Sequence, residues 1–346
     1  MNASEPRRPP SFGMIALAVA VAALIVWYLV SRPDDDALIV YCAHDLVFAE
    51  PILKEFERET GIPVVIVPDT EATKSLGLVE RILQEQAAPQ CDVFWNNQTL
   101  GTIQLQEAGV LHPYQGTGYQ RIPAPLKDPD GHWVGFGGRL RVWIVNTDLM
   151  EPTQAAIDEA LAGEDLQMMA IAMPVFGTTL SHYSLLWEVL GEDGLKQFHS
   201  DLENRGCRIV SGNSTVKNLV AEGVCTFGMT DTDDFFVGKD AGAPVEQIPI
   251  RVNGKTICIP NSVAIIKGTR RLKSAQALVD YLASQKTELK LAASDSRQIP
   301  LGPVDESELP EDVKPLARWA RETADLTGLG SARADCLRWL KAEYAP

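Results

Sequence analysis

Apolar segments of strand length alternate with amphipathic segments of helix length after position 37. Strands are predicted at 38–41, 63–67 and 92–95, and helices follow the last two at 73–86 and 98–108. In such an alternation each helix crosses over between neighbouring parallel strands. The sequence therefore predicts an α/β fold built on a doubly wound, mostly parallel sheet that is flanked by helices.

A second unit of the same kind follows a glycine joint at 137–138, which leads into a long apolar strand. Its further strands are predicted at 169–173, 208–210 and 224–228. The apolar stretch 256–266 contains a single proline and indicates a strand that returns to the first unit. Because 346 residues exceed one ordinary core, we expect two domains.

Polar residues follow each predicted strand of the first unit, where the chain leaves the sheet. His44 and Asp45 follow the first strand, Glu71 follows the second, and Asn96 and Asn97 end the third. Each residue alone suits a helix cap or a turn. The carboxyl ends of parallel strands meet at one edge of the sheet, where open α/β folds bind ligands. Their convergence therefore predicts a binding site.

The densest carboxylate cluster comes from the second unit. Asp231, Asp233 and Asp234 follow the strand at 224–228 within a few residues. One Asp at a strand-to-helix turn is explained by capping and by the helix dipole. Three neighbouring negative charges repel one another unless a cation or strong donors lie among them. Both a capping role and a ligand role are therefore open.

Composition argues against two classes of partner. The formal net charge of -15 at pH 7 argues against nucleic acid, which needs a basic surface. The six cysteines include no CxxC pair, and no histidine lies at metal-finger spacing, so a structural zinc site is not expected. Cys207 and Cys225 flank predicted strands, where they either form a disulfide or remain buried and free.

The amino terminus carries an apolar run. Residues 14–30 are all apolar, and as a helix they would span about 26 Å, close to the hydrocarbon core of a bilayer. Arg7 and Arg8 precede the run and three aspartates follow it, which predicts a cytoplasmic amino end and an extracytoplasmic remainder. We expect residues 1–36 to form a cytoplasmic stub, an uncleaved signal anchor and a spacer, with a cleaved signal peptide as the alternative.

Several short blocks, in this order and spacing, resemble the extracytoplasmic solute-binding proteins of ABC importers, in the branch of the periplasmic ferric-ion-binding proteins. The blocks are AEPILKEF at 49–56, ETGI at 59–62, CDVFWNN at 91–97, GNS at 212–214, GMTD at 228–231 and IPL at 299–301. The resemblance covers about residues 37–305. It implies a type II periplasmic-binding-protein fold with two α/β lobes and a double-strand hinge. The implied lobes are 37–138 plus 263–304, and 139–262 plus 305–346.

Ferric-binding members of that branch hold iron through a His, a Glu and two adjacent Tyr. The resemblance places those positions at or beside Asp45, near Asn97, and at Asp233 and Asp234, and the chain contains no Tyr-Tyr pair. The tyrosinate iron site therefore does not carry over. The family's anion site falls on Gly177, Thr178, Thr179, Asn213 and Asp231, with Arg139 nearby.

The predicted function is that of a membrane-tethered, monomeric solute-binding component that delivers its ligand to an ABC permease in the inner membrane. A metal cation such as ferric iron is favoured, held by Asp45, Asp233 and Asp234. The alternative is a small zwitterionic or phosphorylated solute, such as an aminophosphonate. The full predicted ligand-binding set is His44, Asp45, Glu71, Asn96, Asn97, Arg139, Gly177, Thr178, Thr179, Asn213, Asp231, Asp233 and Asp234.

A metal-assisted hydrolase is the rival class, because clustered carboxylates also serve hydrolysis. The chain has no nucleophile elbow, no Walker loop and no HExxH motif. We therefore predict a binding protein rather than an enzyme, with no enzyme cofactor.

Overall fold

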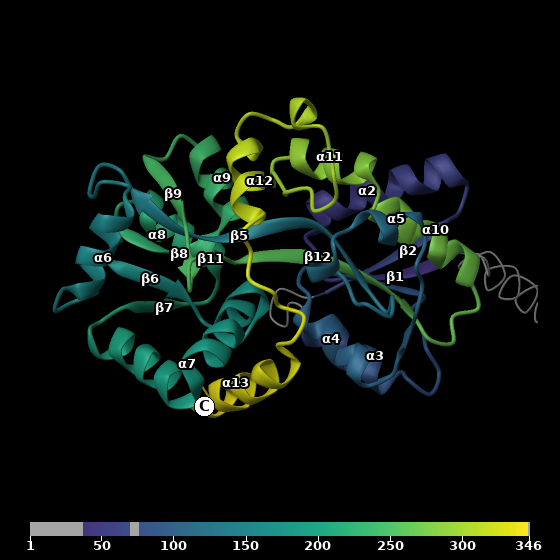
Figure 1. Cartoon of the computed structure of the whole chain (residues 1–346), viewed down its shortest axis with the longest axis horizontal. Helices are drawn as coiled ribbons and strands as arrows, with labels where there is room; N and C mark the ends of the chain where they lie inside the picture. The colour runs from purple at the N-terminus through teal and green to yellow at the C-terminus, as the bar shows by residue number, and fades with distance from the viewer. Residues whose placement is uncertain (1–36, 70–75, 345–346) are drawn as a thin grey trace, which may run out of the picture. The chain divides into compact units, whose positions relative to one another are not determined.

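A mixed sheet of ten strands organises the described chain, which comprises residues 37–69 and 76–344 of a computed structural model (Figure 1). Its main path runs β2-β1-β3-β12-β5-β8-β6-β7, while β4 pairs with β12 and β9 pairs with β5. Among the described residues, no helix is both long enough and apolar enough to cross a bilayer. The predicted anchor at 14–30 and the predicted site residue Glu71 lie outside the described residues.

The first half of the sheet, β1 to β3 with α2 to α4, confirms the predicted alternation. β1 lies between β2 and β3 and pairs in parallel with both. The apolar residues of α2 recur at helical spacing and are buried on one face, and Gly61 ends the helix in the left-handed conformation. The elements are β1 (Leu38–Cys42), α2 (Leu46–Thr60), β2 (Val64–Pro68), α3 (Leu76–Gln84), β3 (Val93–Asn96) and α4 (Leu100–Glu107).

Two long strands, β5 (Val134–Asn146) and β12 (Cys258–Ile266), link the halves, and every residue of both is buried. β12 pairs antiparallel with β5 and with β3, so it is the predicted return strand. The predicted glycine joint lies inside β5 rather than before it. The connecting elements are β4 (Leu111–His112), α5 (Thr117–Arg121) and η2 (Ala124–Leu126).

The second half, β6 to β8 with α6 to α9, is also parallel at its centre, because β6 pairs with both β7 and β8. β8 runs from Phe227 to Asp231, three residues later than predicted, so Asp231 ends the strand instead of following it. The elements are α6 (Gln154–Ala162), β6 (Met169–Ala172), α7 (Gly177–Asn204), β7 (Arg208–Val210), α8 (Asn213–Ala221), β8 (Phe227–Asp231), α9 (Thr232–Asp240) and β9 (Val245–Pro249).

The carboxyl-terminal helices pack on both halves. α10 lies beside α5 and β12 in the first half, whereas α13 packs along α7 in the second (Figure 1). The Tyr344 hydroxyl lies 2.7 Å from His199 Nε2 at that second contact. The elements are β10 (Arg251–Val252), β11 (Lys255–Thr256), α10 (Leu272–Leu282), α11 (Gln285–Ala293), η3 (Glu306–Glu308), α12 (Val313–Ala320) and α13 (Gly330–Glu343).

The six cysteines are all buried and free, so the disulfide considered between Cys207 and Cys225 does not form. The reason is the strand order. Cys207 precedes β7 and Cys225 precedes β8, and β6 lies between those two strands. The predicted lobe boundaries remain a prediction, because the sheet is continuous through β5 and β12.

Candidate functional site

A cavity of about 390 Å³ lies where strands from both halves of the sheet end. The chain that follows β1, β3, β6 and β7 lines it, together with Asp231 at the end of β8. Ten of the thirteen predicted site residues line this cavity: Asp45, Asn97, Arg139, Gly177, Thr178, Thr179, Asn213, Asp231, Asp233 and Asp234. The convergence inferred from the strand ends is therefore present in the tertiary structure.

Two predicted residues lie behind the cavity wall rather than on it. His44 is buried, stacks on the Trp95 ring with 5.5 Å between centroids, and contacts Gln298. Asn96 is fully buried and donates its amide to the Thr102 hydroxyl at 3.2 Å. Asn96 is the last residue of β3, whereas His44 lies in the bend after β1. The residues that follow them, Asn97 and Asp45, line the cavity instead.

Sequence reasoning missed the apolar part of the lining. Phe48 on α2, Phe176 before α7 and Val237 on α9 all line the cavity. Each belongs to a helix or precedes one, and nothing in the local sequence shows that these positions face a site. Ser214 also lines the cavity, and only its place in the GNS block pointed to it.

Asp231, in the cavity wall, accepts hydrogen bonds from residues of three different elements. Its Oδ1 accepts from Arg141 Nη1 at 2.7 Å, and its Oδ2 accepts from the Thr178 hydroxyl at 2.5 Å and from Asn213 Nδ2 at 3.0 Å. These partners lie on β5, α7 and α8, so one carboxylate ties the starts of two helices to the sheet. Arg141 is fully buried and was not predicted. Because Asp231 already has three donors, its main role here is structural.

Asp233 and Asp234 occupy the first turn of α9 and are far less well neutralised. Burial raises the pKa of Asp233, against the opposing effect of Arg139 and together with the charges of Asp231 and Asp45. Burial, followed by the charges of Asp233 and Asp231, raises the pKa of Asp234 well above its usual range. One carboxylate oxygen from each of Asp231, Asp233 and Asp234 lies within 4.8 Å of the others. A cation among them would relieve this repulsion.

Arg139 is the basic side chain in the cavity wall, and it is 5% exposed. Its Nη1 lies 3.4 Å from Asp233 Oδ2, and its Nη2 donates to Asn261 Oδ1 at 3.1 Å. Four carboxylates, the three of β8 and α9 plus Asp45, face two guanidinium groups, Arg139 and Arg141. When all six groups are ionised, the four carboxylates exceed the two guanidinium groups by two negative charges.

The opposite kind of ligand group is offered by helix amino termini. α7 begins at Gly177 and α8 begins at Asn213, and both residues line the cavity. The first N–H groups of a helix lack partners within the helix and favour anions. Gly177 has φ 51°, a left-handed conformation that favours glycine at this turn. The cavity therefore combines an acidic wall with two helix starts.

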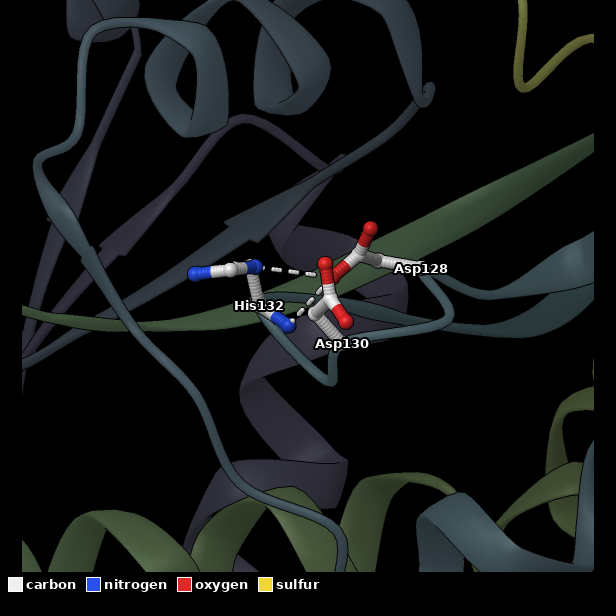
Figure 2. Close-up of side chains that lie close together, drawn as sticks. All are labelled: Asp128, Asp130 and His132. Atoms are coloured by element: carbon white, nitrogen blue, oxygen red, sulfur yellow. Dashed lines mark hydrogen bonds and ion pairs between the residues drawn. The ribbon is translucent and has the colours of Figure 1, made fainter.

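A second group of potential metal ligands, Asp128, Asp130 and His132, lies in the turn that precedes β5 (Figure 2). Dashed lines in Figure 2 join Asp128 to the backbone N–H and to the ring of His132. The backbone N–H of His132 donates to Asp128 Oδ2 at 2.8 Å, and His132 Nδ1 lies 2.8 Å from the same oxygen. The other carboxylate oxygen of Asp128 accepts from Gln106 Nε2 at 2.7 Å. Asp128 thus stabilises the turn, and Asp130 is exposed.

Residues 38–293 match the family profile described as bacterial extracellular solute-binding protein. The chain belongs to this family. The resemblance seen in the sequence is thereby confirmed, and membership of a family of binding proteins agrees with the prediction that the chain is not an enzyme.

Two curated relatives of this solute-binding protein come from Synechocystis sp. Iron uptake protein A2 is 24% identical over 248 residues, which cover 66% of this chain and 70% of the relative. Iron uptake protein A1 is 23% identical over 296 residues, which cover 81% of this chain and 79% of the relative.

Solved structures establish the fold. Iron-bound HitA from Pseudomonas aeruginosa has a TM-score of 0.74 at 19% identity, over 88% of this chain and 99% of HitA. The ferric binding protein from Campylobacter jejuni has a TM-score of 0.77 at 17% identity, over 89% and 99%. AfuA from Actinobacillus pleuropneumoniae, with fructose-6-phosphate bound, has a TM-score of 0.67 at 18% identity, over 90% and 99%. The solute-binding protein thus has the α/β periplasmic-binding-protein fold, with a mixed sheet.

Proposed function

We propose that this solute-binding protein is the receptor of a bacterial ABC importer, which captures its ligand in the 390 Å³ cavity and delivers it, as a monomer, to a permease. Family membership supports the receptor role. The position of the cavity supports it too, because ligand sites in this kind of fold lie at the carboxyl ends of strands.

The ligand that we propose first is a hard cation, with ferric iron as the leading candidate. The observation that carries this proposal is the pair Asp233 and Asp234 in the cavity wall. Asp233 is 13% exposed and lies 3.4 Å from Arg139, and burial together with the neighbouring carboxylates raises the pKa of both groups. Asp45 lines the same cavity and completes an all-oxygen set, which suits hard cations. The two Synechocystis relatives are iron uptake proteins, and HitA from Pseudomonas aeruginosa was solved with iron bound.

The site differs from a tyrosinate iron site. No tyrosine is among the described residues that line the cavity. Carboxylates are weaker ligands for ferric iron than tyrosinates, so a carboxylate site would bind ferric iron less tightly and would discriminate less among hard cations. We therefore include calcium and manganese among the cations to be tested.

A small zwitterionic or phosphorylated solute is the second candidate, and the size of the cavity favours it. A volume of about 390 Å³ is in the range of small-molecule pockets and far exceeds one ion. In this arrangement the anionic end would meet Arg139 and the starts of α7 and α8, and an ammonium or hydroxyl end would meet Asp233 and Asp234. The neighbour AfuA was solved with fructose-6-phosphate, a phosphorylated solute.

Native purification without chelators, followed by elemental analysis and mass spectrometry, tests both candidates. Stoichiometric iron, calcium or manganese that is lost in the Asp233→Asn, Asp234→Asn double variant would support the cation site. Asp130→Asn, which removes an exposed carboxylate from the turn of Figure 2, is the matched control and should retain the metal. A bound organic molecule without metal would instead support the second candidate.

We also propose that residues 14–30 tether the receptor to the cell membrane, with the folded part on the extracytoplasmic side. The unbroken apolar run and its flanking charges support this. The full chain should remain with membranes after alkaline extraction, whereas a chain that starts at residue 37 should be released. Recovery of both chains in the soluble fraction would contradict the anchor.

A further inference from the structure

Five polar side chains form a continuous series of hydrogen bonds that ends at the cavity wall in the ion pair between Arg139 and Asp233. Gln298 Nε2 lies 2.9 Å from His44 Nε2, and Gln298 Oε1 accepts from Asn261 Nδ2 at 2.7 Å. Asn261 Oδ1 then accepts from Arg139 Nη2 at 3.1 Å, and Arg139 Nη1 faces Asp233. Gln298 and Asn261 are fully buried. This series of side chains therefore connects the segment before α2 with the start of α9, through residues of β12 and β5.

The orientation of the central amide is determined by its surroundings. Asn261 Nδ2 donates to the backbone carbonyls of Phe136 and Gly137 as well as to Gln298. With the NH₂ group facing three acceptors, the carbonyl oxygen of Asn261 must face the guanidinium of Arg139. A flipped amide would place donor against donor at Arg139 and acceptor against acceptor at the carbonyls. Arg139 is thus held by a neutral, buried acceptor.

The backbone is shaped locally to bring these side chains together. The pairing of β12 with β5 shifts register between Pro260 and Asn261, and such bulges redirect a side chain. Gly137 has φ 47°, and a Cβ there would lie 2.7 Å from Gln298 Oε1, so only glycine leaves room for the Gln298 side chain. Ile299 pairs with Gly138 through two backbone hydrogen bonds of 2.7 Å, which places Gln298 beside β5.

The same strand offers an internal comparison. Arg141 and Arg139 both project from β5 toward acidic residues of the β8–α9 segment. Arg141 lies 2.7 Å from Asp231, the distance of a charge-assisted hydrogen bond, whereas Arg139 lies 3.4 Å from Asp233. Arg141 also donates to an asparagine, from Nη1 to Asn213 Oδ1 at 3.0 Å, but its Nη2 has no hydrogen-bond partner among the described residues. Nη2 of Arg139, in contrast, donates to Asn261.

We propose that Asn261 and Gln298 are positioning residues that hold Arg139 back from Asp233. Through this restraint the carboxylate of Asp233 stays only partly neutralised and remains available to a ligand, while Asp231 is fully engaged by Arg141. The consequence for ligand binding rests on the proposed function of the cavity. The restraint itself is a property of the ligand-free chain.

Coulomb's law gives the size of the effect. With an effective dielectric constant of about 20, a move of Arg139 from 3.4 Å to about 2.8 Å from Asp233 strengthens the ion pair enough to weaken a competing cation about sixfold. Gln298 acts one step further from the charge, so its replacement should have a smaller effect of the same sign.

The test uses the full-length chain in mild detergent and three variants: Asn261→Leu, Asn261→Asp and Gln298→Met. Crystal structures of the ligand-free proteins should show the Arg139–Asp233 distance below 3.0 Å in Asn261→Leu and above 3.4 Å in Asn261→Asp, where a new carboxylate attracts Arg139. Terbium(III) luminescence, which reports a hard cation on carboxylates, should show a Kd about sixfold higher in Asn261→Leu and no higher than wild type in Asn261→Asp.

Opposite responses of the two Asn261 variants distinguish positioning from a purely structural role, which would impair both alike. An unchanged Arg139–Asp233 distance in Asn261→Leu, or shifts in the same direction in both variants, would overturn the proposal. If Asn261→Leu fails to fold, Gln298→Met gives the same test, with a shortened distance expected and an unchanged one overturning the proposal. A wild-type protein that binds neither terbium nor iron would refute the cation site and leave the distance test intact.

Discussion

Asp231 and Asp234 lie three residues apart in the same acidic cluster, and we predict that removing their charges has opposite effects on stability. In Asp231→Asn the fully buried Arg141 loses its anionic partner at 2.7 Å. Unit charges at that distance attract by about 6 kcal/mol with an effective dielectric constant of about 20. Removing one member of a buried pair typically costs about 3–5 kcal/mol. We expect a loss in that range, and a decrease in Tm of roughly 5–8 °C for a chain of this size.

In Asp234→Asn the effect should be reversed, because burial and two neighbouring carboxylates raise the pKa of Asp234 in the folded state. A carboxyl group with a raised folded pKa destabilises the folded state once it ionises. The gain, about 1 kcal/mol, should therefore be present above the folded pKa of Asp234. It should disappear as the pH falls below the unfolded pKa, where wild-type Asp234 is protonated in both states.

The assay is urea unfolding of the ligand-free proteins at pH 7 and at pH 3.5. Asp130→Asn, at an exposed position, serves as the control and should change the free energy of unfolding by less than about 0.5 kcal/mol. Adding Arg141→Met to Asp231→Asn should recover most of the lost stability, because no buried charge then remains unpaired. If Asp231→Asn leaves the free energy of unfolding unchanged, or if Asp231→Asn and Asp234→Asn lower it equally, the division of this cluster into a structural and a ligand-binding carboxylate is refuted.

Three further predictions follow from the same contacts. Replacing Asp233 and Asp234 together with Ala should abolish terbium binding and leave the circular-dichroism spectrum unchanged, whereas unfolding would show that both are structural caps. Terbium affinity should fall as the pH is lowered through the raised pKa values of these two carboxyls, since protons compete with the cation, and a flat profile would exclude them as ligands. Gly137→Ala should lower the free energy of unfolding by about 1–3 kcal/mol, measured in urea, because its φ is positive and its Cβ would meet Gln298.

The alternation of strands and helices could be predicted because it follows from the local spacing of apolar residues along the sequence. Apolar runs such as that of β1 and the apolar face of α2 report burial directly, so element type and order followed from the sequence. The gathering of Asp45, Asn97 and Asp233 also followed, since parallel strands place their carboxyl ends at one edge. The strand before Asp231 was misplaced by three residues, because an apolar run does not mark its own hydrogen-bonding limits.

The roles of neighbouring residues could not be predicted, because they depend on partners that are distant in sequence. Asp231 and Asp233 look alike in the chain. Only the antiparallel register that sets Arg141 opposite Asp231 makes one of them structural. The sequence likewise left open whether Cys207 and Cys225 form a disulfide, and only the strand order shows that β6 lies between their strands.

The sequence by itself determined an α/β fold and an acidic cluster at the strand ends, since these depend on periodicity and on residue type. Only the tertiary structure decided which charges are neutralised. A bulge at Pro260–Asn261 and a left-handed glycine at 137 bring Asn261 to Arg139 across more than a hundred residues. Ion-pair strength depends on distances of a few tenths of an ångström, and such distances are set by packing and strand register.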